Sequence, residues 1–177
     1  MLPAKPKIKR TKTAKQALES LMRLCARAER SSGDALRLMN GWEVPATERN
    51  EVLQRLIRER YIDDERYAEA FVREKTNLSA WGEYKIRTSL RRKGIADEII
   101  NRALAQLSPE QNRERLIQRL QRKAKSIKYD TTYQLKTKLI RYGASLGFAM
   151  EEVIESTNEV IRTLNQNIEE CKEEFYF

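Results

Sequence analysis

The sequence contains no histidine, and this absence excludes several kinds of active site. Histidine is the commonest general base and the commonest metal ligand in proteins. Ser-His-Asp hydrolysis, Cys-His nucleophiles and histidine-ligated zinc are therefore excluded. The two cysteines, Cys25 and Cys171, lack the paired spacing of metal-binding and redox motifs. Cys25 lies on an apolar helix face, where we expect it to be a small buried side chain.

Residues that break helices are also scarce, with only six glycines and four prolines among 177 residues. Leucine, arginine and glutamate are abundant, so the composition predicts an all-α protein. No apolar run approaches the roughly 20 residues that a membrane-spanning helix needs. The absence of a signal peptide and of paired cysteines predicts a cytoplasmic protein. We expect a non-enzymatic protein, without a metal or cofactor, that binds an anionic partner.

The formal net charge of +9 is unevenly distributed along the chain. Residues 1–15 hold six Lys and Arg and no acidic residue, whereas residues 151–177 hold two basic and eight acidic residues. Between them, residues 85–150 hold 16 Lys and Arg but only five Asp and Glu. We therefore expect a disordered basic arm at 1–13, an acidic end at 166–177, and a positive surface on the second half of the folded part.

Helix-start and helix-stop signals recur along the chain. Thr13 with Gln16, and Ser108 with Gln111, each form the pattern of a capping box. Ser31 or Ser32 is expected to begin a short helix, and Gly94 and Gly147 are expected to end helices. Further helix starts are predicted at Thr47, Ser79 and Asp130. These signals predict about nine short helices.

Asp63, Asp64 and Glu65 could be regarded as a Mg²⁺ site. Consecutive helical side chains point about 100° apart, however, so three of them cannot easily converge on one ion. Capping and the helix dipole account for the acidic residues, and Ile62 with Tyr67 fits a hydrophobic staple. We therefore expect a helix start here, without a metal.

The helices are expected to group in threes. The segment 94–100 (GIADEII) is echoed at 147–154 (GFAMEEVI). Ile95 follows Val44 by 51 residues and Phe148 follows Ile95 by 53. This spacing predicts three tandem three-helix repeats that pack on their neighbours, with boundaries at 14–62, 63–107 and 108–165.

Several unusual residues in 61–95 resemble the RecX family. These are the run Tyr61-Ile62-Asp63-Asp64-Glu65-Arg66-Tyr67-Ala68, then Phe71-Val72-Arg73, Trp81-Gly82 and Lys93-Gly94-Ile95. Arg30-Ser31-Ser32 is also similar to the family's pattern. The resemblance covers roughly residues 14–165 and implies an elongated, slightly curved array of three-helix repeats.

The same resemblance implies a function. RecX proteins regulate the RecA recombinase: they bind RecA and RecA–DNA filaments, and restrain ATP hydrolysis, strand exchange and co-protease activity in recombination and the SOS response. Weak direct binding to DNA is also implied, and we expect a monomer. A free-standing nucleic-acid-binding module, acting on DNA phosphates without a protein partner, is the alternative. The scattered carboxylates disfavour a third possibility, a Mg²⁺-dependent nuclease.

Basic side chains on three predicted helices are the candidate contacts with RecA or DNA. On the helix over 113–128, arginines lie opposite an apolar face, and few acids intervene. Trp42 and Trp81 have no basic neighbour in sequence, so we expect them to pack between repeats and not to stack on bases. The candidate residues are Lys85, Arg87, Arg91, Arg92, Arg115, Arg119, Arg122, Lys123, Lys136, Lys138 and Arg141.

Overall fold

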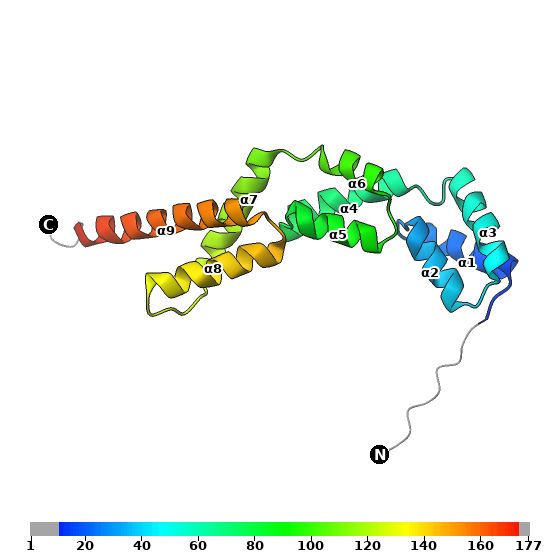
Figure 1. The fold of residues 1–177 in the computed structure, drawn as a ribbon, viewed down its shortest axis with the longest axis horizontal. Helices are drawn as coiled ribbons and strands as arrows, with labels where there is room; N and C mark the ends of the chain where they lie inside the picture. The colour runs from blue at the N-terminus through cyan, green and yellow to red at the C-terminus, as the bar shows by residue number, and fades with distance from the viewer. Residues whose placement is uncertain (1–10, 174–177) are drawn as a thin grey trace, which may run out of the picture. The chain divides into compact units, whose positions relative to one another are not determined.

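The computed structural model describes the backbone of residues 11–173 and the side chains of residues 11–166 (Figure 1). Over this range the chain forms nine α-helices and no strand, which confirms the all-α prediction. No helix in the described part is long and apolar enough to cross a membrane. The predicted basic arm lies outside the described residues up to position 10, as do positions 174–177 of the acidic end. The helices are α1 (Ala14–Cys25), α2 (Ser32–Gly41), α3 (Ala46–Arg58), α4 (Asp64–Ser79), α5 (Glu83–Arg92), α6 (Asp97–Leu104), α7 (Pro109–Ala124), α8 (Thr132–Leu146) and α9 (Met150–Glu173).

Local sequence signals account for many of the helix ends. Thr13 and Gln16 form the predicted capping box of α1, and Ser108 caps α7 with proline at the first helical position. Ser31, not Ser32, caps α2. Gly147 ends α8 with φ of +87°, in the left-handed region that glycine tolerates best.

Three predicted helix starts were wrong. The third helix begins at Ala46 and its N-cap is Pro45, two residues before the predicted cap Thr47, because the fixed φ of proline suits an entry into a helix. Ser79 is the last residue of α4, and the chain turns at Ala80 (φ +49°) before α5 begins at Glu83. Thr131, and not Asp130, caps α8 through its hydroxyl, which accepts a hydrogen bond from Gln134 N.

The described helices belong to two compact units that cut across α4 and α5. Unit 1 contains residues up to 70 together with 89–103, and unit 2 contains 71–88 together with 104 onwards. The predicted repeat boundaries at 14–62, 63–107 and 108–165 stay a prediction.

Unit 1 has its core between α1, α2 and α3. Apolar residues recur at helical spacing on each of these helices, so each buries one face. Leu21, Met39 and Leu56 are fully buried there. The buried residues of this α1–α3 cluster are Ala17, Leu18, Leu21, Ala35, Met39, Val44, Val52, Leu53, Leu56 and Ile62.

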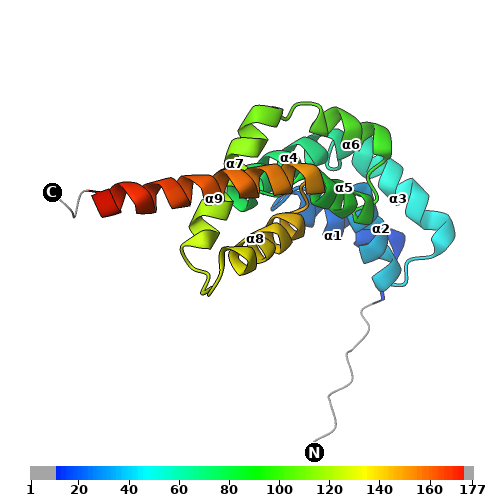
Figure 2. The ribbon, with the colours of Figure 1, turned by 60° about the vertical axis from the view of Figure 1, so that its left-hand side comes forward.

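Unit 2 has its core between α7, α8 and α9, and α8 and α9 lie side by side (Figures 1 and 2). Gly143 lets the two helices approach, because a Cβ at this position would come within 2.7 Å of Val153 Cγ1. The buried core residues are Leu116, Leu120, Ala124, Leu135, Leu139, Leu146, Phe148, Val153 and Val160.

In unit 1, the N-terminus of α2 is seated on the C-terminus of α5. The hydroxyl of Ser31 donates to the carbonyl of Lys93 (2.7 Å), and a Cβ on Gly33 would come within 2.1 Å of the same oxygen. Only glycine therefore allows this approach. The positive end of the α2 dipole meets the negative end of α5, which is the favourable arrangement.

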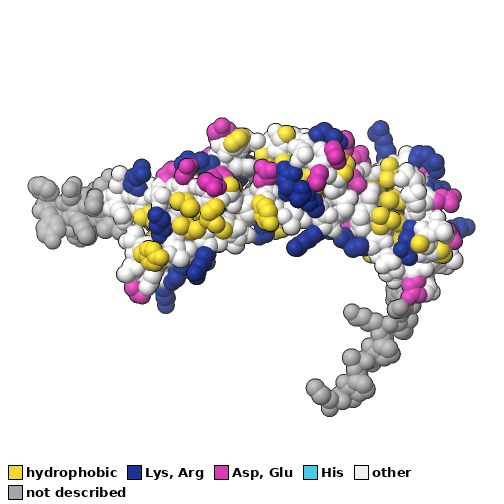
Figure 3. Space-filling view, viewed as in Figure 1, with side chains coloured by type: hydrophobic (Ala, Val, Ile, Leu, Met, Phe, Trp, Pro, Cys, Tyr) yellow, Lys and Arg dark blue, Asp and Glu magenta, His cyan; other side chains and the backbone are white. Residues whose placement is uncertain are grey.

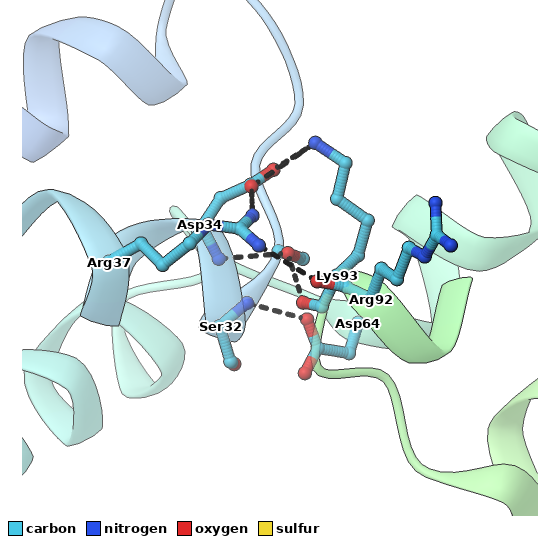
Figure 4. A network of polar contacts seen from close by, with 7 residues as sticks. Ser32, Asp34, Arg37, Asp64, Arg92 and Lys93 are labelled. Carbon is cyan, nitrogen blue, oxygen red and sulfur yellow. Dashed lines mark hydrogen bonds and ion pairs between the residues drawn. The ribbon is translucent and has the colours of Figure 1, made fainter. Parts of the chain in front are cut away.

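Charged side chains surround this α2–α5 junction (Figure 4). The Asp34 side chain is only 11% exposed and pairs with Lys93 Nζ (3.0 Å) and with Arg37. Arg37 also donates to the carbonyl of Arg92 (2.8 Å), at the end of α5. Asp64, from α4, accepts a hydrogen bond from Ser32 N (2.8 Å). The last carbonyls of a helix and its first amides have no hydrogen-bond partner within the helix. At this junction, these side chains supply partners for carbonyls at the end of α5 and amides at the start of α2.

In unit 2, the N-terminus of α5 is seated on the C-terminus of α8 in the same way. Gly82 N donates to the carbonyl of Leu146 (2.8 Å), and Tyr84 N donates to the carbonyl of Gly147 (3.1 Å). A Cβ on Gly82 would come within 2.4 Å of the Gly147 oxygen, so this approach also requires glycine. Lys85 Nζ donates to the carbonyl of Ser145 (2.9 Å).

Candidate partner-binding surface

The structure divides the eleven predicted site residues between the two units. Arg91 and Arg92 lie at the end of α5 in unit 1, whereas the other nine lie in unit 2. Each group is therefore a separate candidate surface. The nine residues in unit 2 are Lys85, Arg87, Arg115, Arg119, Arg122, Lys123, Lys136, Lys138 and Arg141.

In unit 1, the two arginines differ in their surroundings. The guanidinium of Arg91 donates two hydrogen bonds to Asp97, at 2.7 and 3.1 Å, so its charge is compensated within the unit. Arg92 is exposed, and its backbone carbonyl accepts the hydrogen bond from Arg37. Only Arg92 of this pair presents an uncompensated charge to a partner.

The two candidates near the start of α5 are half-buried and make contacts within unit 2. Lys85 Nζ lies 4.6 Å from the centroid of the Trp81 ring, in addition to its bond to Ser145. Arg87 pairs with Glu83 one turn earlier in the helix (2.7 Å). Both therefore stabilise the α5 N-terminus.

Arg115 and Arg119 hold the end of α4 against α7. Arg115 donates to the side-chain oxygen of Asn77 (3.0 Å), and Arg119 donates to the carbonyl of Leu78 (2.8 Å). The latter bond satisfies one of the last carbonyls of α4, which have no partner within the helix. Both arginines are half-buried, so their first role is structural.

The remaining five candidates lie at the end of α7 and on α8. Lys123 Nζ lies 5.5 Å from the Tyr142 ring centroid, and Lys138 Nζ donates to the carbonyl of Lys128 (2.8 Å). The side chains of Arg122, Lys136 and Arg141 have no hydrogen bond or ion pair within the described part of the chain. Of these five candidates, these three are the ones whose charge is left for a partner.

Two tyrosines beside these cations were missed by the sequence reasoning. Tyr133 is 78% exposed and Tyr129 is 44% exposed, which is unusual for large aromatic side chains. Residues 122–141 contain seven Lys and Arg and a single acid, Asp130, and the interleaving of tyrosine with lysine was the signal that could have found them. Exposed rings among cations favour the stacking of unpaired bases.

We call these cations and tyrosines, all exposed except for the half-buried Lys136, the α7–α8 surface. Tyr133 and Lys136 are three residues apart on α8 and are therefore neighbours on one helix face. Figure 3 shows Lys and Arg side chains projecting from α8. The surface consists of Arg122, Lys125, Lys128, Tyr129, Tyr133, Lys136 and Arg141.

Both tryptophans are half-buried, and lysines that are not adjacent in sequence lie beside their rings. Lys12 Nζ lies 3.6 Å from the Trp42 ring centroid, where the ring packs against the unit 1 core. Trp81 makes an edge-to-face contact with Phe71, at 6.3 Å between ring centroids and 68° between planes. Lys75 Nζ lies 5.5 Å from the Trp81 centroid. These contacts favour cation–π packing over base stacking at the two tryptophans.

The acidic cluster at the start of α4 is engaged in local contacts. Asp63 accepts a hydrogen bond from Arg66 N (3.0 Å), Asp64 accepts one from Ser32 N in the first turn of α2, and Glu65 pairs with Arg102. Among the described residues, no group of three or more Asp, Glu or Cys side chains could hold a metal ion. Cys25 is half-buried, and burial raises the pKa of its thiol.

Residues 63–104 match the family model described as RecX, second three-helix domain. Over this segment the chain is similar to the RecX family. The resemblance to the RecX family that residues 61–95 predicted is therefore confirmed. The matched segment runs from the N-cap of α4 to the end of α6, and so includes α5 with its ends in both junctions.

Curated RecX relatives match over less than half of their own length. The regulatory protein RecX of Clostridium botulinum (strain Eklund 17B / Type B) is 32% identical over 103 residues, which cover 57% of this chain and 48% of that protein. The regulatory protein RecX of Mycolicibacterium smegmatis (strain ATCC 700084 / mc(2)155) is 37% identical over 90 residues, which cover 51% and 48%. These relatives are named as regulatory proteins and not as enzymes.

Two solved RecX structures have a similar fold. The crystal structure of RecX from Lactobacillus salivarius aligns over 83% of this chain and 96% of its own, with a TM-score of 0.72 and 20% identity. The crystal structure of a regulatory protein RecX aligns over 82% and 73%, with a TM-score of 0.76 and 23% identity. At these identities the likeness concerns the fold alone.

Proposed function

We propose that this chain regulates RecA by binding RecA and RecA–DNA filaments, and that it restrains ATP hydrolysis, strand exchange and co-protease activity. The similarity of residues 63–104 to the RecX family is the observation that supports this function most directly. The partner comes from the resemblance to the RecX family. The chain's own residues add a candidate contact, the α7–α8 surface.

The α7–α8 surface has the chemistry of an anion-binding surface. Arg122, Lys136 and Arg141 have no acidic partner in the described part of the chain, so no internal ion pair must break before they bind phosphate or carboxylate. Opposite charges on the two partners speed up their association and help to fix how they are aligned in the complex. The exposed rings of Tyr129 and Tyr133 can contact bases of the filament's DNA.

In this proposal the protein acts by occupying a surface and not by chemistry. A bound copy would exclude a second DNA strand, and it would favour whichever filament conformation it binds most tightly. Because the effect is differential binding, inhibition should saturate at stoichiometric amounts of the protein and should weaken as salt screens the α7–α8 surface.

The first experiment measures RecA ATP hydrolysis on single-stranded DNA with increasing amounts of this protein. We expect the rate to fall, and the lifetime of the filament to shorten. A variant with Arg122, Lys136 and Arg141 replaced by Glu should inhibit at least tenfold more weakly. An unchanged rate and an unchanged filament lifetime with the wild-type protein would exclude the proposal.

The matched control reverses three exposed arginines outside the α7–α8 surface, Arg27, Arg58 and Arg73. This variant has the same net charge as the first. A difference between the two variants therefore reports the position of the charges and not their number. We expect it to inhibit nearly as well as the wild type. Equal loss in both variants would show that only the net charge matters.

A free-standing DNA-binding module remains the second candidate, because the α7–α8 surface suits nucleic acid by itself. This alternative predicts tight binding to naked DNA, with a salt slope of about 0.7–0.9 log units for each phosphate contact. RecA regulation predicts weak binding to naked DNA and much tighter binding to the filament. Comparing the two affinities at one salt concentration separates the candidates.

A further inference from the structure

Helices α8 and α9 of unit 2 carry an apolar stripe that is open to solvent. Met150, Ile154 and Ile161 lie within about 40° of one another on α9, because successive helical residues turn by about 100°. Met150 is 48% exposed and Ile154 is 38% exposed. On α8, Tyr133 and Ile140 are seven residues apart and therefore share one face, and Tyr133 is 78% exposed. A contiguous exposed apolar surface of this kind marks an interaction site.

Contacts with α7 show that both halves of the stripe lie where α8 and α9 meet. Glu159 of α9 pairs with Arg113 of α7 (2.5 Å), so this edge of α9 faces α7. Ile161 lies about 200° further round the helix, on the opposite edge, which faces α8. The ring of Tyr142 on α8 has a lysine ammonium of α7 at 5.5 Å, and Ile140 lies about 200° from it, on the edge that faces α9.

Charges of opposite sign flank the stripe. Glu155 lies about 100° beyond Ile154, on the side of α9 away from α8, and Arg141 lies about 100° beyond Ile140, on the side of α8 away from α9. Neither Glu155 nor Arg141 has a hydrogen bond or ion pair within the described part of the chain. Figure 3 shows hydrophobic side chains gathered over α9, with acidic side chains along the upper edge of this patch and basic side chains below it.

The two flanking charges stand at the same level along the helices. Helices α8 and α9 run in opposite directions (Figure 1), and Gly143 lies against Val153. Arg141 is two residues before Gly143, and Glu155 is two residues after Val153, so the two are level with each other. The other charged residues on these two edges are each level with an uncharged residue of the other helix: Glu151 with Ser145, Arg162 with Gln134 and Lys138 with Asn158.

This arrangement is complementary to itself. A two-fold axis parallel to the two helices places α9 of one copy over α8 of a second copy, and it keeps every residue at its own level. Glu155 of each copy then meets Arg141 of the other, twice across the interface, and the two apolar stripes face each other. The perpendicular axis would instead place α9 over α9 and bring the two acidic edges together.

We propose that this face binds a second copy of the chain, as a two-fold dimer with two Glu155–Arg141 ion pairs. Burial of the stripes stabilises the dimer, and the ion pairs at its edges fix the alignment. The sequence alone led us to expect a monomer, because the exposed face depends on how α8 packs on α9. If the proposed function holds, dimer and filament compete, since Tyr133 and Arg141 also belong to the α7–α8 surface.

The first test measures association of the whole chain by sedimentation velocity, at concentrations from about 1 to 200 μM. We expect a monomer–dimer equilibrium with a Kd in the micromolar range, and Ile154→Lys should weaken it at least tenfold by placing a charge in the stripe. Leu36→Lys is the matched control, because Leu36 is 39% exposed on α2 of unit 1, and it should leave the dimer unchanged. A monomer at the highest concentration, or equal loss in both variants, would overturn the proposal.

The second test examines the two-fold pairing. Arg141→Glu and Glu155→Arg each place like charges at both ion pairs, so each variant alone should dimerise more weakly than the wild type. An equimolar mixture of the two variants restores opposite charges at both pairs, and it should associate at least fivefold more tightly than either variant alone. A mixture as weak as its components would contradict the assignment. Neither measurement involves RecA or DNA, so the dimer and the proposed function can fail independently.

Discussion

The α2–α5 and α5–α8 junctions share the same close backbone packing but differ in the groups that stabilise it. In both, a helix N-terminus is seated on a helix C-terminus, and a glycine removes the Cβ that would collide with a backbone carbonyl. In unit 1 the junction adds a carboxylate, Asp34, between two cations. In unit 2 the hydrogen bonds run mainly from backbone to backbone, and Lys85 is the added cation. Both junctions therefore require two backbone segments to approach closely, whereas the charged side chains around them differ.

This difference matters because a half-buried ion network and a set of backbone bonds respond differently to substitution. Removing one member of a network leaves the remaining charges without partners, which costs more than the loss of one contact. Each unit contains one of the two tryptophans, Trp42 in unit 1 and Trp81 in unit 2. Single Trp→Phe variants therefore let the unfolding of each unit be followed separately by fluorescence.

The largest expected effect comes from adding a methyl group at a junction glycine. In Gly33→Ala and in Gly82→Ala, the new Cβ would meet backbone atoms at 2.1 and 2.4 Å, and backbone cannot move aside as a side chain can. We expect each substitution to lower the free energy of unfolding of its own unit by about 3 kcal/mol, measured by urea denaturation.

Gly41→Ala is the matched control for these two variants. Gly41 is the last residue of α2, and a Cβ there would meet no atom within 4 Å. Alanine loses less backbone entropy than glycine on folding, so Gly41→Ala should leave stability unchanged or raise it by up to about 1 kcal/mol. If Gly33→Ala behaved like Gly41→Ala, the close approach at the α2–α5 junction would not exist.

The second largest effect is expected from Asp34→Ala in unit 1. The carboxylate has partners on Lys93 and Arg37, and its removal leaves both cations to be rehydrated. Hydrogen bonds to charged groups are worth about 1.5–3 kcal/mol, so we expect a loss of about 2 kcal/mol in the urea unfolding of unit 1. If the free energy of unfolding fell by less than 0.5 kcal/mol, the Asp34 ion pairs would not distinguish the stability of the two junctions. That threshold is about the worth of an exposed ion pair.

Lys85→Met should have a smaller effect in unit 2. Methionine keeps the apolar stem beside Trp81 but loses the bond to the Ser145 carbonyl and the cation–π contact. Together these contributions are worth about 1 kcal/mol at a half-exposed site. Trp81 fluorescence during urea unfolding measures the change. A cost greater than that of Asp34→Ala would reverse the ranking of the two junctions.

The smallest effect concerns pH and Glu152. Burial raises the pKa of this carboxyl above 4.5, while the charge of Arg113 lowers it. A raised pKa in the folded state means that stability falls as pH rises from the unfolded value through the folded one. Glu152→Gln should therefore be more stable than the wild type at pH 7, and this advantage should disappear at pH 4. Parallel thermal melts at the two pH values are the measurement, and an advantage that persists at pH 4 would contradict this cause.

Patterns that depend on neighbours in sequence predicted much of the fold. The capping residues Thr13, Ser31 and Ser108, and the helix stops Gly94 and Gly147, could be recognised because their partners lie within a few residues. The predictions at Thr47 and Ser79 were wrong because the local sequence pattern is ambiguous. A hydroxyl residue near a proline or a turn looks the same in sequence whether or not it caps a helix.

Contacts between distant helices could not be predicted in the same way. Arg115 and Arg119 occupy the polar side of α7, yet that side meets the end of α4, about 40 residues earlier in the chain. Hydrophobic periodicity distinguishes apolar from polar faces, but it does not distinguish a solvated polar face from one that another helix covers. A cavity of about 560 Å³ in unit 2 is likewise lined by three separate stretches, 83–87, 104–112 and 147–152, and no pattern within any one of them predicts it.

The seating of α2 on α5 also has a consequence for the order of events during synthesis. Ser31 binds a carbonyl 62 residues further along the chain, so α2 stays without this support until that residue has been made. At about 5–20 residues per second, the interval is about 3–12 s. During that time the core of α1–α3 can form, but its Asp34 carboxylate has not yet met Lys93. A ribosome-bound chain that ends before residue 89 should therefore be an unfinished unit, open to chaperones and proteases until the last turn of α5 emerges.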